Sequence, residues 1–361
     1  MPEGGVRGEG QKAVPEIRYL DAGEKGRSRE LWEEAFPEDS KSFDDYYFEE
    51  KLKDNRILVL EEAGRIDAMI HLNPYLVQVK DRRWRVDYLV GVATRKDRRH
   101  RGYMRRLLMQ MMADMRAENM PFCFLMPADE AIYRPFGFTY IYRQPQWEWK
   151  AGVLEDTVRA AECRAADWNV EELADWMNRW LADRYQVYAV REPEYLRRLL
   201  KEIESEDGTF EVLYDGDEMT GMESLWGWGE KEQRLLYGME SCIREKAEPK
   251  PAIMARIISV EPFMNVICLK NSVQEEELTV PLCLEDPLIA ENDGTWAWHL
   301  NHETSWLERV EAGQIEMSGP ALKLTITELT GWLFGYEIPE AAAAWAEVVL
   351  TLDGVFLDEI V

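Results

Sequence analysis

The sequence predicts an α+β fold with several domains, in which mixed sheets carry helices. The chain of 361 residues is longer than a single hydrophobic core usually requires. Strand-like runs between residues 57 and 92 lead into a helix with one apolar stripe. Part of the same strand, turn and strand layout returns at residues 211–226. We therefore expect two related mixed-sheet domains followed by a different α+β module.

The domain boundaries follow from where these patterns change. Residues 1–15 are rich in glycine at their start and lack a periodic pattern, so we expect a flexible leader. The first domain is predicted at 16–150, the second at 151–260 and the third at 261–361.

The composition excludes several classes of protein. The apolar fraction of 46% and the charged fraction of 31% are typical of globular proteins. A net charge of −26 argues against binding of nucleic acid or anionic membranes and mildly favours a cationic substrate. The five cysteines form no C-x-x-C motif, so we expect neither a disulfide framework nor a metal site. Neither a membrane-spanning run nor a secretory signal is apparent, and we expect a cytoplasmic protein.

The first domain begins with a short helix and then changes to strands. Leu31, Trp32, Ala35 and Phe36 have helical spacing. The runs 57–60 and 66–72 are separated by a Gly-containing turn, which predicts a hairpin, and the runs 75–79 and 84–92 form a second pair in the same way. The last of these strands leads towards the most informative stretch of the chain.

That stretch joins the strand to a long helix, and it is predicted to bind a phosphate group. Its residues are Arg99, His100, Arg101, Gly102, Tyr103 and Met104. A glycine turn that opens a helix leaves backbone N–H groups unpaired, and the helix dipole attracts an anion to them. The two arginines add charge that the amides lack. Because the stretch is locally basic, a nucleic-acid patch is the alternative, and the overall negative charge disfavours it.

The helix after Gly102 has a single apolar stripe. Its members are Met104, Leu107, Leu108, Met111, Met112 and Met115. A methionine-lined ligand groove is one interpretation, but packing on a sheet explains the spacing alone. A buried strand at 121–126 follows, which completes a right-handed βαβ unit. A short polar segment at 128–133 and an aromatic strand at 136–149 end the domain.

The second and third domains carry weaker signals. Strands at 211–214 and 219–226 follow a helical stretch at 194–206, as in the first domain, but no Arg-x-x-Gly opens a helix there. We interpret this region as a degenerate duplicate. In the third domain we expect strands at 278–284, 296–300 and 322–327, an Ala-rich helix at 340–349, and an apolar end at 356–361 that packs inside the protein.

The first domain resembles the GNAT superfamily of N-acetyltransferases, in which an Arg/Gln-x-x-Gly-x-Gly/Ala motif follows a strand and opens a helix. The motif here is Arg99-x-x-Gly102-x-Met104, with methionine at the position of the small residue. Together with the run Ile-Tyr-Arg-Pro-Phe-Gly-Phe at 132–138, the duplicated half and the third module, this is similar to the Eis (enhanced intracellular survival) branch. The resemblance extends from residue 16 to Val361.

The resemblance implies tandem GNAT-like domains, of which the second is degenerate, and a sterol carrier protein-like third domain. It also implies acetyl-CoA as co-substrate, no metal, primary amines of the aminoglycoside, polyamine or lysine type as acceptors, and assembly as hexamers. The implied CoA-binding residues are Val92, Ala93 and Thr94, which pair with the pantetheine arm, and Arg99, His100, Arg101, Gly102, Tyr103, Met104 and Arg105, which hold the pyrophosphate. Tyr133 matches the general acid, and Val361 supplies a chain-terminal carboxylate as base.

The chemistry of acyl transfer is consistent with these roles. Direct transfer needs an amine without its extra proton, a polarised thioester carbonyl and a proton donor for the departing thiolate. A tyrosine hydroxyl, with an ordinary pKa of about 10, stays protonated at neutral pH and can donate to that thiolate. A chain-terminal carboxylate is ionised at neutral pH and can accept the ammonium proton.

Several alternatives remain open at this point. His299 and His302 could ligate a metal if they lay on one face of a helix, but the alternation at residues 296–300 indicates a strand. Glu33, Glu34, Asp358 and Glu359 could line a cation-attracting site or be solvated charges. The whole protein could instead be a non-enzymatic carrier of an apolar ligand in the third domain, or an inactive CoA-binding sensor.

Overall fold

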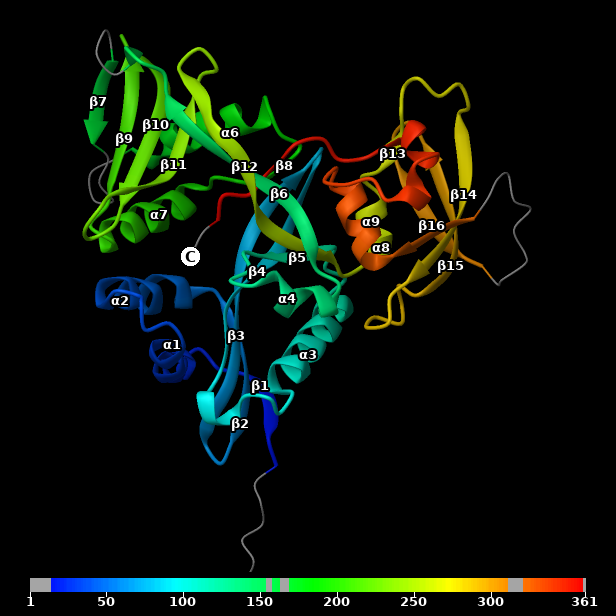
Figure 1. Ribbon diagram of the computed structural model, residues 1–361, viewed down its shortest axis with the longest axis horizontal. Coiled ribbons are helices and arrows are strands. Elements are labelled where there is room, and N and C mark those ends of the chain that lie inside the picture. Colours follow the sequence, from blue (N-terminus) through cyan, green and yellow to red (C-terminus); the bar gives the residue numbers. More distant parts are fainter. Residues whose placement is uncertain (1–13, 154–157, 163–168, 311–320, 360–361) are drawn as a thin grey trace, which may run out of the picture.

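The computed structural model describes residues 14–153, 158–162, 169–310 and 321–359. Most of the predicted leader lies outside these residues. The three larger of the four sheets in the described residues form three lobes with their helices, and the lobes meet around a crossing of strands at the centre (Figure 1). Within the described part, no helix has the length and apolar character that a membrane span requires.

The central sheet is built mainly from the first domain. Its strands run in the order β1-β2-β3-β4-β5-β12-β6. They are β1 (Glu16–Tyr19), β2 (Arg56–Glu62), β3 (Arg65–Val79), β4 (Arg82–Thr94), β5 (Phe122–Leu125), β12 (Ile243–Ile257) and β6 (Thr139–Trp149). All neighbours along this order are antiparallel except β4 and β5, which are parallel and enclose the predicted βαβ unit.

The predicted hairpins are confirmed with one correction. The sequence predicts separate strands at 66–72 and 75–79, whereas β3 continues through both. Proline usually interrupts a strand because it cannot donate a backbone hydrogen bond. Here Pro74 remains in register opposite Asp87 of β4, so the long strand passes through it.

Helices cover both faces of the central sheet. The helices α1 (Arg29–Ala35) and α2 (Lys41–Glu50) lie on one face, and α3 (Tyr103–Ala117) lies on the other (Figure 1). The predicted apolar stripe of α3 is buried from Leu107 to Met115, which confirms core packing as the role of its methionines.

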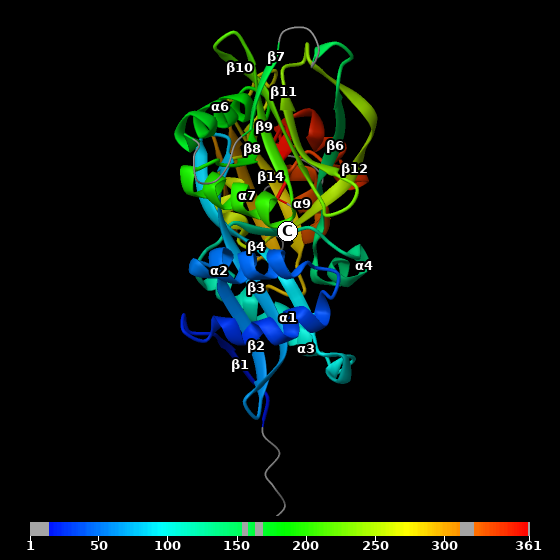
Figure 2. The same ribbon diagram turned by 90° about the vertical axis from the view of Figure 1, so that its left-hand side faces the viewer.

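The second sheet has the order β11-β10-β9-β7. Its strands are β7 (Val158–Glu162), β9 (Thr209–Asp215), β10 (Glu218–Trp226) and β11 (Glu232–Gly238), and its helices are α6 (Val170–Ala182) and α7 (Pro193–Ser205). This confirms the predicted helix, strand, turn and strand layout. In both perpendicular views α7 lies beside α2 (Figures 1 and 2).

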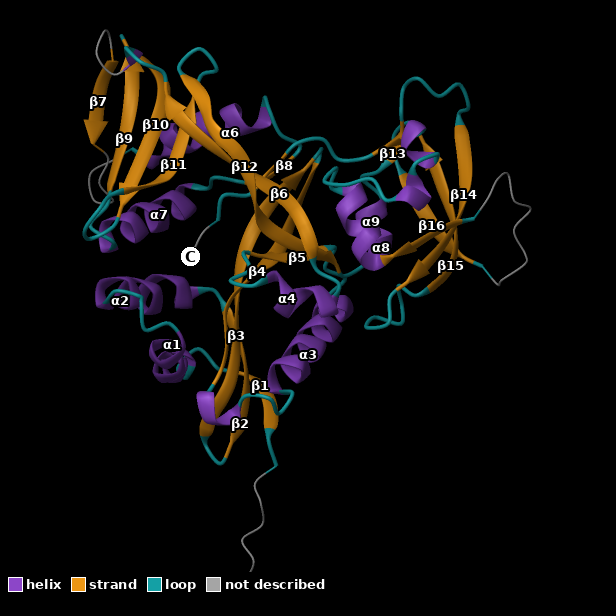
Figure 3. Ribbon diagram, viewed as in Figure 1, coloured by secondary structure: helices purple, strands orange, loops and turns teal. Residues whose placement is uncertain are grey.

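Strands of the second region also join the central sheet. The short strand β8 (Val187–Ala189) pairs with the far end of β3, and the C-terminal strand β19 (Val355–Phe356) pairs with β8. The long strands β6 and β12 form a twisted pair between the two sheets (Figure 3). The sequence predicts a domain boundary between residues 150 and 151. The strand β6 lies before this boundary and β12 lies after it, and the two strands pair within one sheet.

The third domain contains a four-stranded sheet in the order β16-β15-β14-β17. Its strands are β14 (Glu277–Glu285), β15 (Gly294–Asn301), β16 (Ser305–Arg309) and β17 (Leu322–Thr325), and its helices are α8 (Val260–Met264) and α9 (Ile326–Leu333). The remaining pair, β13 (Cys268–Leu269) and β18 (Val349–Leu350), lies beside it.

Two predictions in this domain are wrong. The strand expected at 322–327 ends at Thr325, because a capping box between Thr325 and Glu328 starts α9 there. The Ala-rich helix expected at 340–349 is replaced by two single 3₁₀ turns and β18. Of its alanines only Ala342 is fully buried, whereas Ala341, Ala343 and Ala344 are exposed, and a helix this short needs a continuous apolar face to be stable.

The third domain is joined to the central sheet by a buried ion pair. Arg256 of β12 donates from Nη2 to both carboxylate oxygens of Asp286, at 2.7 and 2.9 Å. Asn292 also donates to this carboxylate at 2.9 Å, and neither charged side chain is accessible to solvent. Gly137 lies against the guanidinium, and a Cβ there would meet Arg256 Nη1 at 2.0 Å.

Loss of this pair is expected to destabilise the protein. Asp286→Asn leaves the Arg256 charge buried without its counterion, and breaking one partner of a buried pair costs about 3 kcal/mol. Urea unfolding followed by tryptophan fluorescence measures the change. Asp45→Asn removes an exposed carboxylate that pairs with Lys41 and should leave the unfolding midpoint nearly unchanged. Equal midpoints for the two variants would contradict the importance of the buried pair.

Candidate active site

The central sheet opens where β4 and β5 diverge. Only Tyr88 and Phe124 pair between these two strands in the described part of the chain. Residues 89–94 of β4 pair with β3 on one side and leave their other backbone edge without a strand. Such an edge offers N–H and C=O groups to an extended ligand.

Gly91 produces a bulge in this segment of β4. Its φ is +59°, and the register with β3 shifts between Met69 and His71. A Cβ at this position would lie 2.5 Å from the ring of Trp32 on α1. Glycine is therefore required here both by the backbone conformation and by the close approach of α1.

The turn after β4 contains the residues that the sequence predicts to bind a phosphate group. His100 and Gly102 both have positive φ, +62° and +74°, and α3 begins at the next residue, Tyr103. No side chain caps this end of the helix, and the first turn contains no acidic residue. The first N–H groups of α3 have no partner within the helix, so they and the helix dipole are available to an anion.

The arginines around this turn fall into two groups. Arg95 and Arg98 are engaged by carboxylates, Arg95 by Glu30 and Glu34 at 2.8 Å each. Arg99, Arg101 and Arg105 are exposed, and within the described residues they form no ion pair. Arg99 and Arg101 donate only to backbone carbonyls at 3.3 Å, and Arg105 lies over the ring of Phe136. Three uncompensated cations thus surround one helix N-terminus of a strongly acidic protein.

Tyr133 lies on a short helix next to this site. The helix α4 (Glu130–Tyr133) follows β5, Asp129 caps it, and Gly137 with positive φ ends the following turn. The Tyr133 ring is buried and meets Phe138 at 6.0 Å between ring centroids. Burial raises the pKa of Tyr133 to about 12, and its hydroxyl has no hydrogen-bond partner among the described residues. The hydroxyl therefore keeps its proton at neutral pH.

The structure brings together most of the site residues predicted from the sequence. Val92 and Thr94 are half-buried on the open edge of β4, while Ala93 is buried on the side of α1. Tyr103 is buried in the core, Met104 is half-buried, and the rest of the turn is exposed. The Arg105 and Phe136 contact joins this turn to the segment of Tyr133. Val361 lies outside the described residues.

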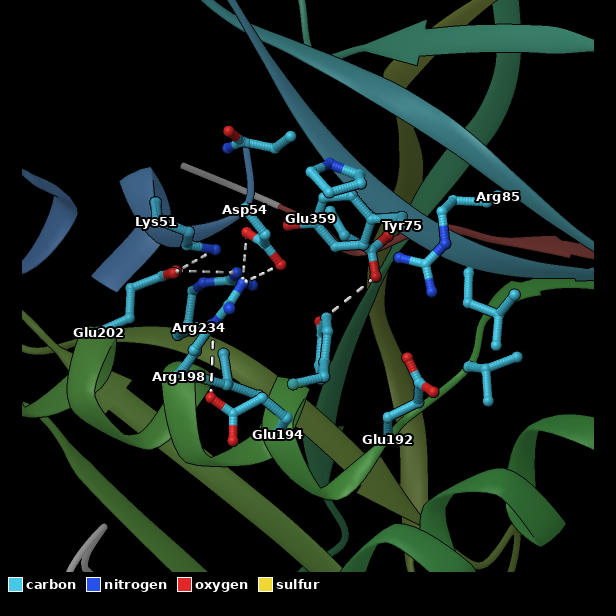
Figure 4. A pocket seen from close by; sticks show the side chains of 16 residues that line it. Lys51, Asp54, Tyr75, Arg85, Glu192, Glu194, Arg198, Glu202, Arg234 and Glu359 are labelled. Atoms are coloured by element: carbon cyan, nitrogen blue, oxygen red, sulfur yellow. Dashed lines mark hydrogen bonds and ion pairs between the residues drawn. The ribbon is translucent and has the colours of Figure 1, made fainter. Parts of the chain in front are cut away.

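A cavity on the opposite face of the sheet was missed by the sequence analysis. It has a volume of about 90 Å³ and lies between β3 and α7 (Figure 4). Other parts of its wall come from the 3₁₀ turn Lys51–Lys53, β4, β11 and the C-terminal segment. No local pattern could have revealed it, because its lining comes from segments more than 300 residues apart in the chain.

Aromatic rings connect this cavity with the opening between β4 and β5. Tyr75 lines the cavity and meets the rings of Tyr88 and Phe124 at 5.8 and 5.9 Å. On its other side Tyr75 meets Tyr195 of α7 at 6.0 Å. The cavity therefore lies behind the single residue pair at which the strands separate.

Charged side chains of both signs line the cavity. Arg198 pairs with Asp54 at 2.8 Å and Lys51 with Glu202 at 3.2 Å (Figure 4). Arg191, which does not line the cavity, pairs with Glu359. The acidic residues considered from the sequence separate accordingly. Glu33 and Glu34 pair with arginines of the first domain, whereas Asp358 and Glu359 are buried and Glu359 reaches the cavity.

The histidines considered as metal ligands lie elsewhere. His299 is on β15, where it stacks on Trp306, and His302 donates from Nε2 to the backbone carbonyl of Glu275, which precedes β14, at 3.1 Å. No group of side chains that could hold a metal occurs among the described residues. The cysteines within them, Cys123, Cys242, Cys268 and Cys283, are free thiols.

Two family models match parts of the chain. Residues 16–141 match the model of an acetyltransferase (GNAT) domain, and residues 263–355 match that of a sterol carrier protein domain. The first domain is therefore a GNAT acetyltransferase domain and the third is a sterol carrier protein-like domain, as the resemblance implied. No curated protein matches the sequence.

Solved structures share the fold along nearly the whole chain. A probable N-acyltransferase from Enterococcus faecalis is 17% identical, with a TM-score of 0.74 over 93% of each chain. A GCN5-related N-acetyltransferase from Kribbella flavida is 16% identical, with a TM-score of 0.69 over 96% of this chain and 99% of that one. Eis1 from Mycobacterium abscessus is 13% identical, with a TM-score of 0.66 over 96% and 100%.

The bulge at Gly91 gives the first test of this site. Gly91→Ala is expected to lower the free energy of unfolding by about 3 kcal/mol, because the new Cβ overlaps Trp32 and the backbone has positive φ. Gly64→Ala is the matched control, since Gly64 also has positive φ but no atom lies within 4 Å of a Cβ there. Urea unfolding compares the two variants. Equal losses would show that the contact with α1 contributes nothing.

Proposed function

We propose that the protein transfers the acetyl group of acetyl-CoA directly to a primary amine. The observation that carries this proposal is the uncapped N-terminus of α3, with three unpaired arginines, beside the open edge of β4. Both features fit an extended thioester carrier with a pyrophosphate, because the pyrophosphate would bind at the helix N-terminus and the extended arm would lie along the strand edge. The match of residues 16–141 to a GNAT acetyltransferase domain supports the same reaction class.

Acetyl-CoA would be held along two elements. The backbone of Val92, Ala93 and Thr94 would pair with the amides of the pantetheine arm, as a strand pairs with its neighbour. The N–H groups from His100 to Arg105, together with Arg99, Arg101 and Arg105, would bind the pyrophosphate. Gly102 and the backbones of Tyr103 and Met104 contribute the start of α3.

Tyr133 would act as the general acid. The attacking amine forms a bond to the thioester carbonyl carbon, and the bond from that carbon to sulfur then breaks. The thiolate of CoA takes the Tyr133 proton, which burial keeps on the hydroxyl. No covalent enzyme intermediate is needed for this sequence.

The acceptor would enter from the cavity behind Tyr88. The acceptor class implied by the resemblance is an aminoglycoside, polyamine or lysine-type amine, and the net charge of −26 favours such cations. The proton acceptor would be a carboxylate of the C-terminal segment, for which Val361 at the chain end is the prediction from the sequence. Assembly as a hexamer and a cytoplasmic location likewise stay proposals from the resemblance.

The carrier alternative is not favoured by the third domain. Trp298 of β15 and Trp332 of α9 are fully buried there and meet edge to face at 6.1 Å. These large rings fill the space between the sheet and its helix in which an apolar ligand would have to lie. An active transferase with this domain as a structural part is therefore the stronger hypothesis.

Removing the unpaired charges should weaken binding of the co-substrate. Arg99→Gln and Arg101→Gln are each expected to raise the Kd for CoA about tenfold at low salt, because each removes one charge-assisted contact to phosphate. The effect should shrink as salt rises. Calorimetric titration with CoA measures this. Lys96→Gln, an exposed cation before the turn, is the control, and equal weakening by all three variants would contradict a localised site.

Tyr133→Phe tests the general acid. The variant should lower kcat by about 10²-fold, the usual contribution of a positioned acid, while the Kd for CoA stays nearly unchanged. Release of free thiol from acetyl-CoA in the presence of an amine gives the rate, and titration gives the affinity. Phe138→Leu alters the packing around the same ring without removing a hydroxyl and serves as control. A kcat equal to that of the unmodified protein would remove Tyr133 from the mechanism.

A further inference from the structure

The C-terminal segment ends in a buried cluster of hydrogen bonds. Arg191 donates from Nη1 to Glu359 Oε1 at 2.6 Å and from Nη2 to Asp358 Oδ1. Tyr237 donates to Asp358 Oδ2 at 2.8 Å, and Arg234 donates to the Asp358 carbonyl at 2.9 Å. These contacts come from two separate parts of the second region, Arg191 before α7 and two residues of β11, so they hold residues 358 and 359 in one position.

The two carboxylates in this cluster are satisfied to different degrees. Both oxygens of Asp358 accept hydrogen bonds. At Glu359, Oε1 accepts from Arg191 and from the Tyr195 hydroxyl at 3.3 Å, whereas Oε2 is buried and has no partner among the described residues. A buried oxygen without a donor is costly, and the side chain of Glu359 is not accessible to solvent.

The unsatisfied carboxylate lies at the wall of the cavity. Glu359 lines it together with Tyr75 and Tyr195 (Figure 4). Burial, followed by the charge of Glu359, raises the pKa of Tyr75. Burial, then Tyr75 and then Glu359 raise the pKa of Tyr88, which belongs to the pair at which β4 and β5 separate. Glu359 thus shares the cavity wall with Tyr75, whose ring meets that of Tyr88 at 5.8 Å.

We infer that the side chain of Glu359 binds the ammonium group of the acceptor and takes its proton. This inference rests on the proposed acetyl transfer and deepens it, because it gives the proton acceptor a residue within the described structure. The free Oε2 would accept the hydrogen bond from the ammonium, while Arg191 and Tyr195 hold Oε1.

With this assignment, every proton in the reaction is accounted for. The ammonium gives one proton to Glu359 and becomes a neutral amine. The amine attacks the thioester, its second proton leaves as the amide forms, and the thiolate of CoA receives a proton from Tyr133. The products are the N-acetylated amine, CoA thiol and one proton released from Glu359 to solvent. Tyr133 is restored by the proton that the amide nitrogen has lost.

The groups around Glu359 determine the direction in which its pKa is shifted. Burial raises the pKa of Glu359, the Arg191 charge opposes this, and the neighbouring Asp358 adds to the rise. From the elements packed against it, Tyr195 and Glu202 of α7, Arg234 of β11 and Tyr75 of β3 also face this region. The net result is a carboxylate whose pKa lies above its ordinary value, and the active form is the deprotonated one.

The experiment compares Glu359→Gln with Asp353→Asn. Asp353 is an exposed carboxylate of the same segment, outside the cavity, and controls for the loss of a charge there. Spermidine, kanamycin and a blocked lysine amide serve as acceptors in a thiol-release assay with acetyl-CoA. Titration with CoA checks that each variant is folded. Glu359→Ala, assayed with and without formate, supplies a small carboxylic acid in place of the missing side chain.

The expected result has three parts. Glu359→Gln should lower kcat/KM about 10²-fold while Asp353→Asn and the affinity for CoA change little. The ratio of kcat/KM between the unmodified protein and Glu359→Gln should rise with pH through the pKa of Glu359 and then level. The part of the pH profile that comes from deprotonation of the acceptor's own ammonium group is the same for both proteins and cancels in this ratio. Formate should restore part of the activity of Glu359→Ala, which a merely structural role would not predict.

Other outcomes separate the two proposals. If Glu359→Gln retains the activity of Asp353→Asn, or if formate restores nothing to Glu359→Ala, the inference is wrong and the proposed transfer stands. If the unmodified protein neither acetylates nor binds any of the three amines, both are wrong. A chain extended by Gly-Ser beyond Val361 should stay active. If the extended chain were inactive while Glu359→Gln remained active, the proton acceptor would be the chain-terminal carboxylate instead of Glu359.

Discussion

The separation of β4 and β5 is the constraint on which the rest of the site depends. Two parallel strands that pair at one position only leave a row of backbone groups without partners inside a sheet. The protein keeps this gap open with the bulge at Gly91, which Trp32 supports from α1, and with the turn that sends the chain into α3. A ligand strand would satisfy the edge, and the same turn places free N–H groups and unpaired arginines at its end.

Local features of the site could be predicted from the sequence because they depend on neighbouring residues. The strand before Thr94, the glycine turn at Gly102 and the apolar stripe of α3 each follow from a short pattern, and all three are present. The cavity could not be predicted, because Glu359, Tyr195 and Tyr75 meet only through the pairing of β8 with β3 and of β19 with β8. The prediction of a helix in the Ala-rich stretch was wrong for a related reason, since most of its alanines are exposed and helix propensity alone does not stabilise so short a helix.

Shared strands and buried charges explain why the three domains act as one body around the site. The strand β12 begins in the second region, runs between β5 and β6, and carries Arg256 into contact with Asp286 of the third domain. Arg256 also supports Gly137, which ends the segment of Tyr133. The third domain thereby contributes to the position of the proposed acid, and the second region, through Arg191, to the position of Glu359.

The sheet also separates the proposed acid, Tyr133, from the proposed base, Glu359. Tyr133 lies on the face of α3, where burial alone sets its pKa and no charged group lowers it. Glu359 lies on the face of α2 and α7, where Arg191 keeps a carboxylate charge available despite burial. If both groups lay on one face, the carboxylate would accept a hydrogen bond from the Tyr133 hydroxyl, and neither group would be free to contact a substrate. With the sheet between them, the proposed acid and base would be linked only by a substrate placed in the gap between β4 and β5, so the proposed proton transfer would require both reactants.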